Sequence, residues 1–286
     1  MCIRDRIKSI HKKGARTKMK NKRGLFITNV ISKVYERIIK ERNSERAKLS
    51  ASQTGGVTGR STIDNTMVML AIVERNKYLK KPTFITFADI EKCFDKLWLE
   101  DGLKDLWKSG MSARDCWALK CLNETARTVV ETPVGKTDEI ILKDTVRQGT
   151  VSGPRICGAS MDNVNKVGHK VVTFYGPDIE IDTQAYVDDL ESAGSCFTAN
   201  NTIKNCNILE ERKKLTVSIE KGKSGVLIVG DRKGSGNVTA KVKRGSFLEV
   251  NEEKFLGTWV DKTGNCMINI KKRKEKTHDI LYQVYS

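Results

Sequence analysis

The sequence predicts an α+β fold in which an antiparallel sheet carries acidic residues at its strand ends and helices pack behind it. Residues 84–88 (FITFA) form a strand-like run that ends at Asp89. Residues 179–186 alternate as a second strand, and Asp188 and Asp189 separate it from another apolar stretch, which is typical of a β-hairpin with an acidic turn. No internal repeat or low-complexity linker divides the chain, so we expect two intermingled subdomains.

Helices are predicted where apolar residues recur at helical spacing or where a capping residue precedes such a run. Ser61 or Thr62 can cap one helix, and Ser112 with Asp115 forms a capping-box pattern before another. Pro154 fits the first turn of a third, where its missing N–H is harmless. The predicted helices are residues 25–39, 62–80, 99–109, 112–126, 153–167, 199–215 and 268–286. Further strands are predicted at residues 225–229 and 254–259, and hairpins at residues 127–142 and 238–250.

The composition favours a polyanionic partner. The chain has 52 Lys and Arg against 35 Asp and Glu, a net charge of +17, and phosphate groups would be drawn to such a surface. The eight cysteines are scattered without a Cys-x-x-Cys pair, so we expect reduced thiols in a nuclear or cytoplasmic protein and no zinc site. The apolar runs are too short to cross a bilayer, and the N-terminus lacks the core of a signal peptide. We therefore expect neither secretion nor a membrane partner.

Three carboxylates would converge if the two acidic strands are neighbours. Asp89, Asp188 and Asp189 have no basic residue beside them in the sequence, so their repulsion favours a bound cation. Carboxylate oxygens suit Mg²⁺ better than Zn²⁺. An Asp-Asp pair is also common in turns simply because Asp tolerates turn geometry, so the second acidic strand end is what gives this pair weight.

Several segments, in order along the chain, resemble the motifs of reverse transcriptases, in particular those of non-LTR, LINE-like retrotransposons. The two acidic segments, residues 87–95 (FADIEKCFD) and 186–190 (YVDDL), are similar to the catalytic motifs of that family. The other similar segments are residues 21–24 (NKRG), 59–62 (GRST), 147–149 (RQG), 152–154 (SGP), 221–224 (KGKS) and 255–257 (FLG). Together they cover about residues 8–270, so motifs that are weak singly are in register.

The resemblance implies a right-hand polymerase fold with a palm, a fingers subdomain and a truncated thumb. The implied divisions are a non-native leader at residues 1–7, fingers at 8–83, a palm at 84–265 with part of the fingers inserted at 110–145, and the start of a thumb helix at 266–286. The implied ligands of two Mg²⁺ ions, for which Mn²⁺ can substitute, are Asp89, Asp188, Asp189 and the backbone of Ile90. Lys221 would donate a proton to pyrophosphate, with Lys223 beside it as the alternative.

The resemblance also implies substrate contacts. Phe94 would clash with a ribose 2′-hydroxyl, although an ordinary core phenylalanine is the competing interpretation. Gln148 would contact the incoming nucleotide, and Gly149 would let its backbone approach closely. Arg23 would clamp the triphosphate, and Arg60 would touch template or phosphate. The implied primer-grip residues are Phe255, Leu256 and Gly257.

The implied function is RNA-templated extension of a DNA primer with deoxynucleoside triphosphates. One alternative within the same fold is a reverse transcriptase or maturase of group II intron type. Another is an inactive nucleic-acid-binding remnant of a decayed element. A small-molecule phosphotransferase with the same acidic cluster fits the charge of +17 poorly.

Overall fold

The computed structural model consists of two compact units, one formed by Met1–Ser50 with Lys92–Asn163 and the other by Ala51–Glu91 with Val164–Ser286. The first and second units are described separately below. The residues that the structure describes are 4–11, 14–15, 17–18, 21–124, 126–132, 134–142, 144–165, 183–194, 201–220, 222–231, 238–265 and 267–285. Among these, no helix is both long and apolar enough to span a bilayer.

The first unit contains a small mixed sheet. Its strands are β1 (Arg4–His11), β2 (Lys22–Ile27), β4 (Arg127–Thr132), β5 (Gly135–Lys136) and β6 (Ile140–Ile141). The order is β2-β1-β4-β5 with β6 on β4, and β1 runs antiparallel to β2 but parallel to β4. The predicted hairpin at residues 127–142 therefore contains a third short strand. Residues 4–7, which the sequence analysis sets aside as a leader, lie within β1.

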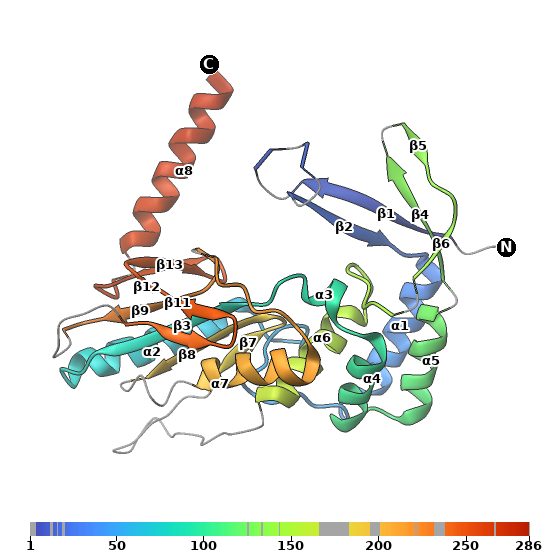
Figure 1. The fold of residues 1–286 in the computed structure, drawn as a ribbon, viewed down its shortest axis with the longest axis horizontal. Helices are drawn as coiled ribbons and strands as arrows, with labels where there is room; N and C mark the ends of the chain where they lie inside the picture. The colour runs from blue at the N-terminus through green and yellow to red at the C-terminus, as the bar shows by residue number, and fades with distance from the viewer. Residues whose placement is uncertain are drawn as a thin grey trace. The chain divides into compact units, whose positions relative to one another are not determined.

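Helices form the rest of the first unit (Figure 1). They are α1 (Val30–Arg42), α3 (Cys93–Lys96), α4 (Leu99–Lys108), α5 (Ala113–Glu124) and α6 (Gly153–Asn165). The amphipathic pattern of α4 buries Leu99, Leu103 and Leu106, as its spacing predicts. The α5 cap is half of the predicted box: the Ser112 hydroxyl accepts from the Asp115 N–H at 3.1 Å, whereas the Ser112 N–H donates to another side chain.

Helix α1 differs from its prediction in both its start and its buried face. The helix begins at Val30 because the Asn29 side chain caps it, accepting from the Ile31 N–H at 2.8 Å, and residues 25–27 belong to β2. Ile39 is buried, but Val30 is 73% exposed. Ile31, Val34 and Ile38 are also exposed. The buried face instead includes Glu36, which accepts from the Ser152 N–H at 2.8 Å, and burial raises the pKa of its carboxyl.

The second unit is built on a five-stranded sheet. In spatial order the strands are β12 (Glu249–Val250), β9 (Gly225–Val229), β3 (Thr83–Asp89), β8 (Asp189–Gly194) and β7 (Gln184–Tyr186). Strand β3 lies in the centre and runs antiparallel to both neighbours. The predicted antiparallel sheet is thus observed except at its edge, where β12 pairs parallel with β9.

Helices contact both faces of this sheet. Helix α2 (Thr62–Tyr78) contacts β3, β7 and β8, and α7 (Asn201–Ile208) contacts β3 and β8 before a π-helical turn (Leu209–Lys213). Ser61 and Asp64 cap α2 reciprocally. The main apolar core of the unit lies on the α2 side and consists of Met69, Val73, Ile85, Phe87, Ala193, Leu227, Val229, Val250, Phe255 and Val260.

Two further hairpins and a helix complete the second unit. Strands β10 (Ala240–Val242) and β11 (Gly245–Phe247) form the predicted basic hairpin. The single strand predicted at residues 254–259 is instead a hairpin of β13 (Glu252–Phe255) and β14 (Thr258–Asp261), because Leu256 and Gly257 both adopt positive φ and reverse the chain. Figure 1 shows the predicted C-terminal helix, α8 (Met267–Tyr285), extending from this hairpin.

Candidate active site

Of the three predicted metal ligands, Asp188 and Asp189 lie on the β7–β8 hairpin and Asp89 lies at the end of β3 (Figure 1 shows these strands). Tyr186 pairs with Asp189, so Val187 and Asp188 make a two-residue turn. Asp89 is in register with Asp189 across the β3–β8 pair. Residues directly opposite each other on antiparallel strands point to the same face, with Cβ atoms about 5 Å apart. The structure thus brings Asp89 and Asp189 together and puts Asp188 at the adjoining turn.

The backbone of Asp89 is fixed by residues that follow far later in the chain. Its N–H donates to the Ser224 hydroxyl at 3.0 Å, and its C=O accepts from the Ser218 N–H at 2.9 Å. Both serines are buried. These two bonds orient the strand end, so they set the direction in which the Asp89 carboxylate leaves the sheet.

A lysine stands beside Asp89. The Lys223 Nζ lies 3.9 Å from the Asp89 carboxylate and 3.1 Å from that of Glu220. The Lys223 and Asp89 side chains remain 26% and 30% exposed, so water screens their attraction and leaves the carboxylate able to exchange partners. Lys221 lies outside the described residues. Lys223 lies next to Asp89, and the choice between the two lysines stays open.

The backbone of Ile90 follows from its pairing. Ile90 faces Val217 in an isolated antiparallel bridge, and the bonds on either side run from Ser218 N–H to Asp89 C=O and from Glu91 N–H to the Thr216 carbonyl at 2.8 Å. In such a bridge the central residue's own N–H and C=O point away from the partner strand. The Ile90 carbonyl is thus directed to the side away from Val217.

The carboxylate oxygens of this region suit a hard divalent cation, although they are not yet gathered around one point. Within the part of the chain that the structure describes, no three His, Cys, Asp or Glu residues already surround one point. Asp89 and Asp189 nevertheless face each other as like charges, which destabilises a strand pair unless a cation lies nearby. Their oxygens, with those of Asp188 one residue earlier, are ligands that Mg²⁺ accepts. The residues fit Mg²⁺ as a donor set, with Lys223 as one competing cation.

A fourth carboxyl lies deeper in the same sheet. Glu191 is two residues beyond Asp189, is paired with Phe87, and is 1% exposed. Burial raises the pKa of the Glu191 carboxyl well above its usual range, so it is held in its neutral form more strongly than the exposed acids. Its environment distinguishes it from the half-exposed Asp89 and excludes it from the set that water and ions can reach.

The predicted nucleotide-binding residues Gln148 and Gly149 belong to the first unit. The Gln148 carbonyl accepts from the Phe26 N–H on β2 at 2.8 Å. Gly149 has φ +111°, and a Cβ at this position would meet the Phe26 carbonyl oxygen at 2.4 Å, so only glycine fits here. The preceding Arg147 is a buried structural residue that pairs with Asp5 at 2.9 Å, and burial lowers the pKa of its guanidinium.

Phe94 and Arg23 also belong to the first unit. The Phe94 ring, partly buried on α3, lies beside Gly153 at the start of α6, where a glycine Cβ would come within 3.6 Å of it. Arg23 is exposed on β2, the strand whose backbone holds Gln148. The structure thus links Gln148, Gly149 and the strand of Arg23 by backbone contacts within one unit.

The remaining predicted contacts fall in the second unit. Arg60 is exposed just before α2. Phe255 is 5% exposed and stacks on Phe87 with ring centroids 5.4 Å apart, so its side chain is part of the core. Leu256 and Gly257 form the β13–β14 turn, in which Gly257 is exposed and Leu256 is half-buried against the core.

A family model described as reverse transcriptase (RNA-dependent DNA polymerase) matches residues 10–260, most of the chain. The chain belongs to the reverse transcriptase family. A search of curated protein sequences finds no match. The family assignment predicted from the motifs is therefore confirmed at the level of reverse transcriptase, and the LINE-like type stays a prediction.

Solved structures of telomerases share the fold of this reverse transcriptase domain. Apo telomerase from Candida tropicalis, truncated from its C-terminal domain, gives a TM-score of 0.60 at 14% identity over 92% of this chain and 54% of that chain. The same organism's telomerase in complex with a TWJ fragment of telomeric RNA gives 0.60 at 11% identity, over 92% and 44%. The chain spans about half the length of these structures. The predicted α+β right-hand polymerase fold is confirmed.

Four residues that hold the predicted acidic site were not identified from the sequence. Ser218 and Ser224 hold Asp89, and Gln53 and Gly55 contact the turn that carries Asp188. Ser224 follows Lys223 directly, so its position in the lysine motif was the available signal. Gln53 gave none, because a glutamine near a Gly-rich loop is most often a solvated residue.

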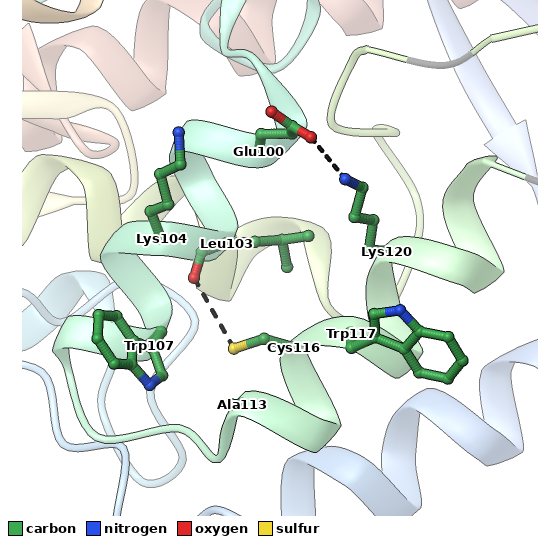
Figure 2. Close-up of a pocket in the computed structure, with 8 residues that line it drawn as sticks. All are labelled: Glu100, Leu103, Lys104, Trp107, Ala113, Cys116, Trp117 and Lys120. Carbon is green, nitrogen blue, oxygen red and sulfur yellow. Dashed lines mark hydrogen bonds and ion pairs between the residues drawn. The ribbon is translucent and has the colours of Figure 1, made fainter.

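A separate pocket of about 250 Å³ lies between α4 and α5 of the first unit, as Figure 2 shows. Its lining is mainly apolar and consists of Glu100, Leu103, Lys104, Trp107, Ala113, Cys116, Trp117 and Lys120. Burial raises the pKa of the Cys116 thiol to about 11, so this sulfur is protonated and a poor nucleophile. The pocket contains none of the predicted site residues.

Proposed function

We propose that this chain is the catalytic core of an RNA-directed DNA polymerase that extends a DNA primer on an RNA template with deoxynucleoside triphosphates. The observation that carries the proposal is the register of Asp89 with Asp189, next to a turn that presents Asp188, in a chain of the reverse transcriptase family. The charge of +17 supports a nucleic-acid partner over a small-molecule substrate.

In this proposal two Mg²⁺ ions would be held mainly by Asp89 and Asp188, with support from Asp189 and the Ile90 carbonyl. When bound, the two ions would activate the primer 3′-hydroxyl and neutralise the departing pyrophosphate. Lys221 or Lys223 would donate a proton to that pyrophosphate. The position of Lys223 beside Asp89 supports it as the donor.

The first unit would supply the nucleotide contacts. We assign the triphosphate to Arg23, the nucleotide to Gln148 and Gly149, and rejection of the ribose 2′-hydroxyl to Phe94. The backbone hydrogen bond between Gln148 and β2, the strand of Arg23, supports the first two assignments, because it connects the two segments directly. In the second unit, Arg60 would contact the template and the turn at Leu256 and Gly257 the primer.

We further assign the chain to a non-LTR, LINE-like retrotransposon, because of the order of its motifs and the residues that form them. Residues 87–95 and 186–190 carry this assignment. A reverse transcriptase of group II intron type is the alternative with the same fold, and template preference would separate them.

Primer extension on an RNA template tests the proposal. Asp188→Asn keeps the size of the side chain and removes its charge, and we expect extension to fall by about a hundredfold or more, because a metal ligand supplies several kcal/mol to the transition state. Asp231→Asn, an exposed acid of the same unit, is the matched control and should extend like the wild type. Equal extension by Asp188→Asn and wild type would refute the assignment. If the wild-type protein binds RNA but adds no nucleotide, the result would favour the alternative that the chain is an inactive nucleic-acid-binding remnant.

A further inference from the structure

The side chain of Gln53 pairs with the turn that carries Asp188. Its Oε1 accepts from the Val187 N–H at 2.9 Å, and its Nε2 donates to the Val187 C=O at 3.2 Å. The same Oε1 accepts from the Gly55 N–H at 3.0 Å. Gln53 is 1% exposed, so these bonds are made away from water, where an unpaired amide is expensive.

The segment around Gln53 also pairs with the strand leading into the turn. The Ala185 N–H donates to the Ser52 carbonyl at 2.8 Å, and the Thr54 N–H donates to the Ala185 carbonyl at 3.0 Å. The backbone of residues 52–54 thus binds Ala185, and the carboxamide of Gln53 binds Val187 two residues later. The carboxamide thus continues the pairing beyond Ala185.

Val187 needs such a partner because of its conformation. It has φ +61°, a region that β-branched residues rarely adopt and that costs about 1–2 kcal/mol relative to ordinary backbone. It is also 9% exposed, so its N–H and C=O require partners inside the protein. A carboxamide supplies one donor and one acceptor in one plane, which suits both groups of a single residue.

Gly55 shows how closely this segment approaches the turn. A Cβ at Gly55 would lie 2.2 Å from the Val187 nitrogen and 2.8 Å from the Tyr186 carbonyl carbon. Any side chain there would push the turn away. The segment and the turn are therefore in contact at the backbone, and displacing one displaces the other.

We propose that Gln53 is a positioning residue for the Asp188 carboxylate. The Val187 carbonyl belongs to the same peptide plane as the Asp188 nitrogen, so a bond to that oxygen limits rotation of the unit from which Asp188 projects. Gln53 acts through the turn and touches neither substrate nor metal. The inference rests on the proposed function, because it assumes that Asp188 binds a divalent cation.

Binding of Mn²⁺ to the full chain, measured by electron paramagnetic resonance, tests this role without requiring catalysis. Gln53→Met removes the two bonds to Val187, together with the bond from the Gly55 N–H, and keeps the length of the side chain. Thr54→Val is the matched control, because Thr54 is buried in the same segment and its hydroxyl donates to Asn65 at 2.6 Å and to the Ala185 carbonyl at 3.4 Å, but to neither residue of the turn. Thermal unfolding and hydrogen exchange of residues 185–190 are recorded on the same samples.

We expect Gln53→Met to weaken Mn²⁺ binding by about tenfold or more, as loss of a residue that orients a metal ligand does, and to speed exchange at the turn. Thr54→Val should lower thermal stability and leave Mn²⁺ affinity unchanged. Equal Mn²⁺ affinity in the two variants would overturn the proposal, as would a wild type that binds no Mn²⁺. If Gln53→Met does not fold, Gln53→Glu serves in its place, since it keeps the acceptor for Val187 N–H and loses the donor.

Primer extension by the wild type separates the two claims. If the wild type adds no nucleotide and Gln53→Met still loses Mn²⁺, the positioning role stands and the polymerase assignment falls. If the wild type extends the primer and Gln53→Met binds Mn²⁺ as the wild type does, the assignment stands and the role of Gln53 falls.

Discussion

Two hairpins of the second unit reverse direction in two residues, and they do so differently. In β13–β14 the turn residues Leu256 and Gly257 have φ +47° and +90°, the signs of a type I′ turn. In β7–β8 only the first residue, Val187, has positive φ, which is the sign pattern of a type II′ turn. Glycine normally fills that first position, and a β-branched residue is among the least suited to it.

The difference follows from what each turn carries. The Val187 turn presents Asp188, and it is held from outside by Gln53 and by the close approach of Gly55. The Leu256 turn takes its shape from its own Gly257, around which a Cβ would find open space. The strained residue Val187 is held by partners outside its turn, whereas the positive φ of Leu256 is accommodated next to the turn's own glycine.

Alanine at the two glycines should separate the two turns most widely. Gly55→Ala introduces a Cβ 2.2 Å from a backbone nitrogen, and we expect a loss of about 3 kcal/mol in the free energy of unfolding. Gly257→Ala has room for its methyl group but must hold it at φ +90°, and we expect a loss of about 1 kcal/mol. Urea denaturation of both variants measures the difference.

The Gly257→Ala variant is the control for a glycine substitution as such. If the two variants unfold at the same urea concentration, the segment at Gly55 does not press on the turn in solution, and the contrast between the hairpins is lost. A larger effect at Gly257 would reverse it.

The buried glutamates of the two hairpins offer a second, smaller contrast. Burial raises the pKa of Glu191 on β8 well above its usual range and raises the pKa of Glu253 on β13 by less. The Glu253 carboxylate accepts from the Lys254 N–H at 3.1 Å. Glu191 Oε2 has no hydrogen-bond partner among the residues that the structure describes. We expect Glu191→Gln to stabilise the protein by about 1–3 kcal/mol above neutral pH, because the amide stays neutral where the carboxyl would have to be buried with a charge. Glu253→Gln should stabilise less.

The pH dependence fixes the sign of this effect. Since the folded protein binds the Glu191 proton more tightly than the unfolded chain does, stability from that proton is full below the ordinary pKa of 4.5 and is lost as pH rises through the folded pKa. Unfolding free energies measured from acid to alkaline pH should therefore decline less steeply in Glu191→Gln than in the wild type. Parallel curves would show that Glu191 titrates normally.

The sequence predicted the elements that local patterns encode. The strand before Asp89 and the cap of α2 at Ser61 depend on neighbouring residues, and the structure has them. Of the hairpin predicted from residue 179 onward, the structure has the turn and the strands β7 and β8 that flank it, and residues 179–182 lie outside the described residues. The sequence predicted that the acidic residues meet only if the two strands are neighbours, because a hundred residues separate Asp89 from Asp189. The register of β3 with β8 shows that the strands are neighbours.

What the sequence could not predict depends on contacts between distant segments. The apolar spacing in α1 identified a helix but not its buried face, because Glu36 is buried by a bond to Ser152. Gln53 lies far from Val187 in sequence, and no periodicity links them. The apolar neighbours of Leu256 and Gly257 predict a strand, because a Gly preceded by Leu signals a turn only weakly.

Leu256→Asn makes the smallest change and tests the β13–β14 turn directly. Asn tolerates positive φ far better than Leu, and Asn-Gly is the preferred pair for a type I′ turn. Because the half-buried Leu256 side chain also packs against the core, we expect a net gain of no more than about 0.5 kcal/mol in unfolding free energy. The same substitution at Val187 should not gain, because Val187 is buried against the Gln53 segment and an Asn side chain there would lose packing and need new partners. Thermal unfolding of the two variants compares them. A gain at Val187 equal to that at Leu256 would mean that φ alone governs both turns and that the Gln53 segment adds nothing to the first.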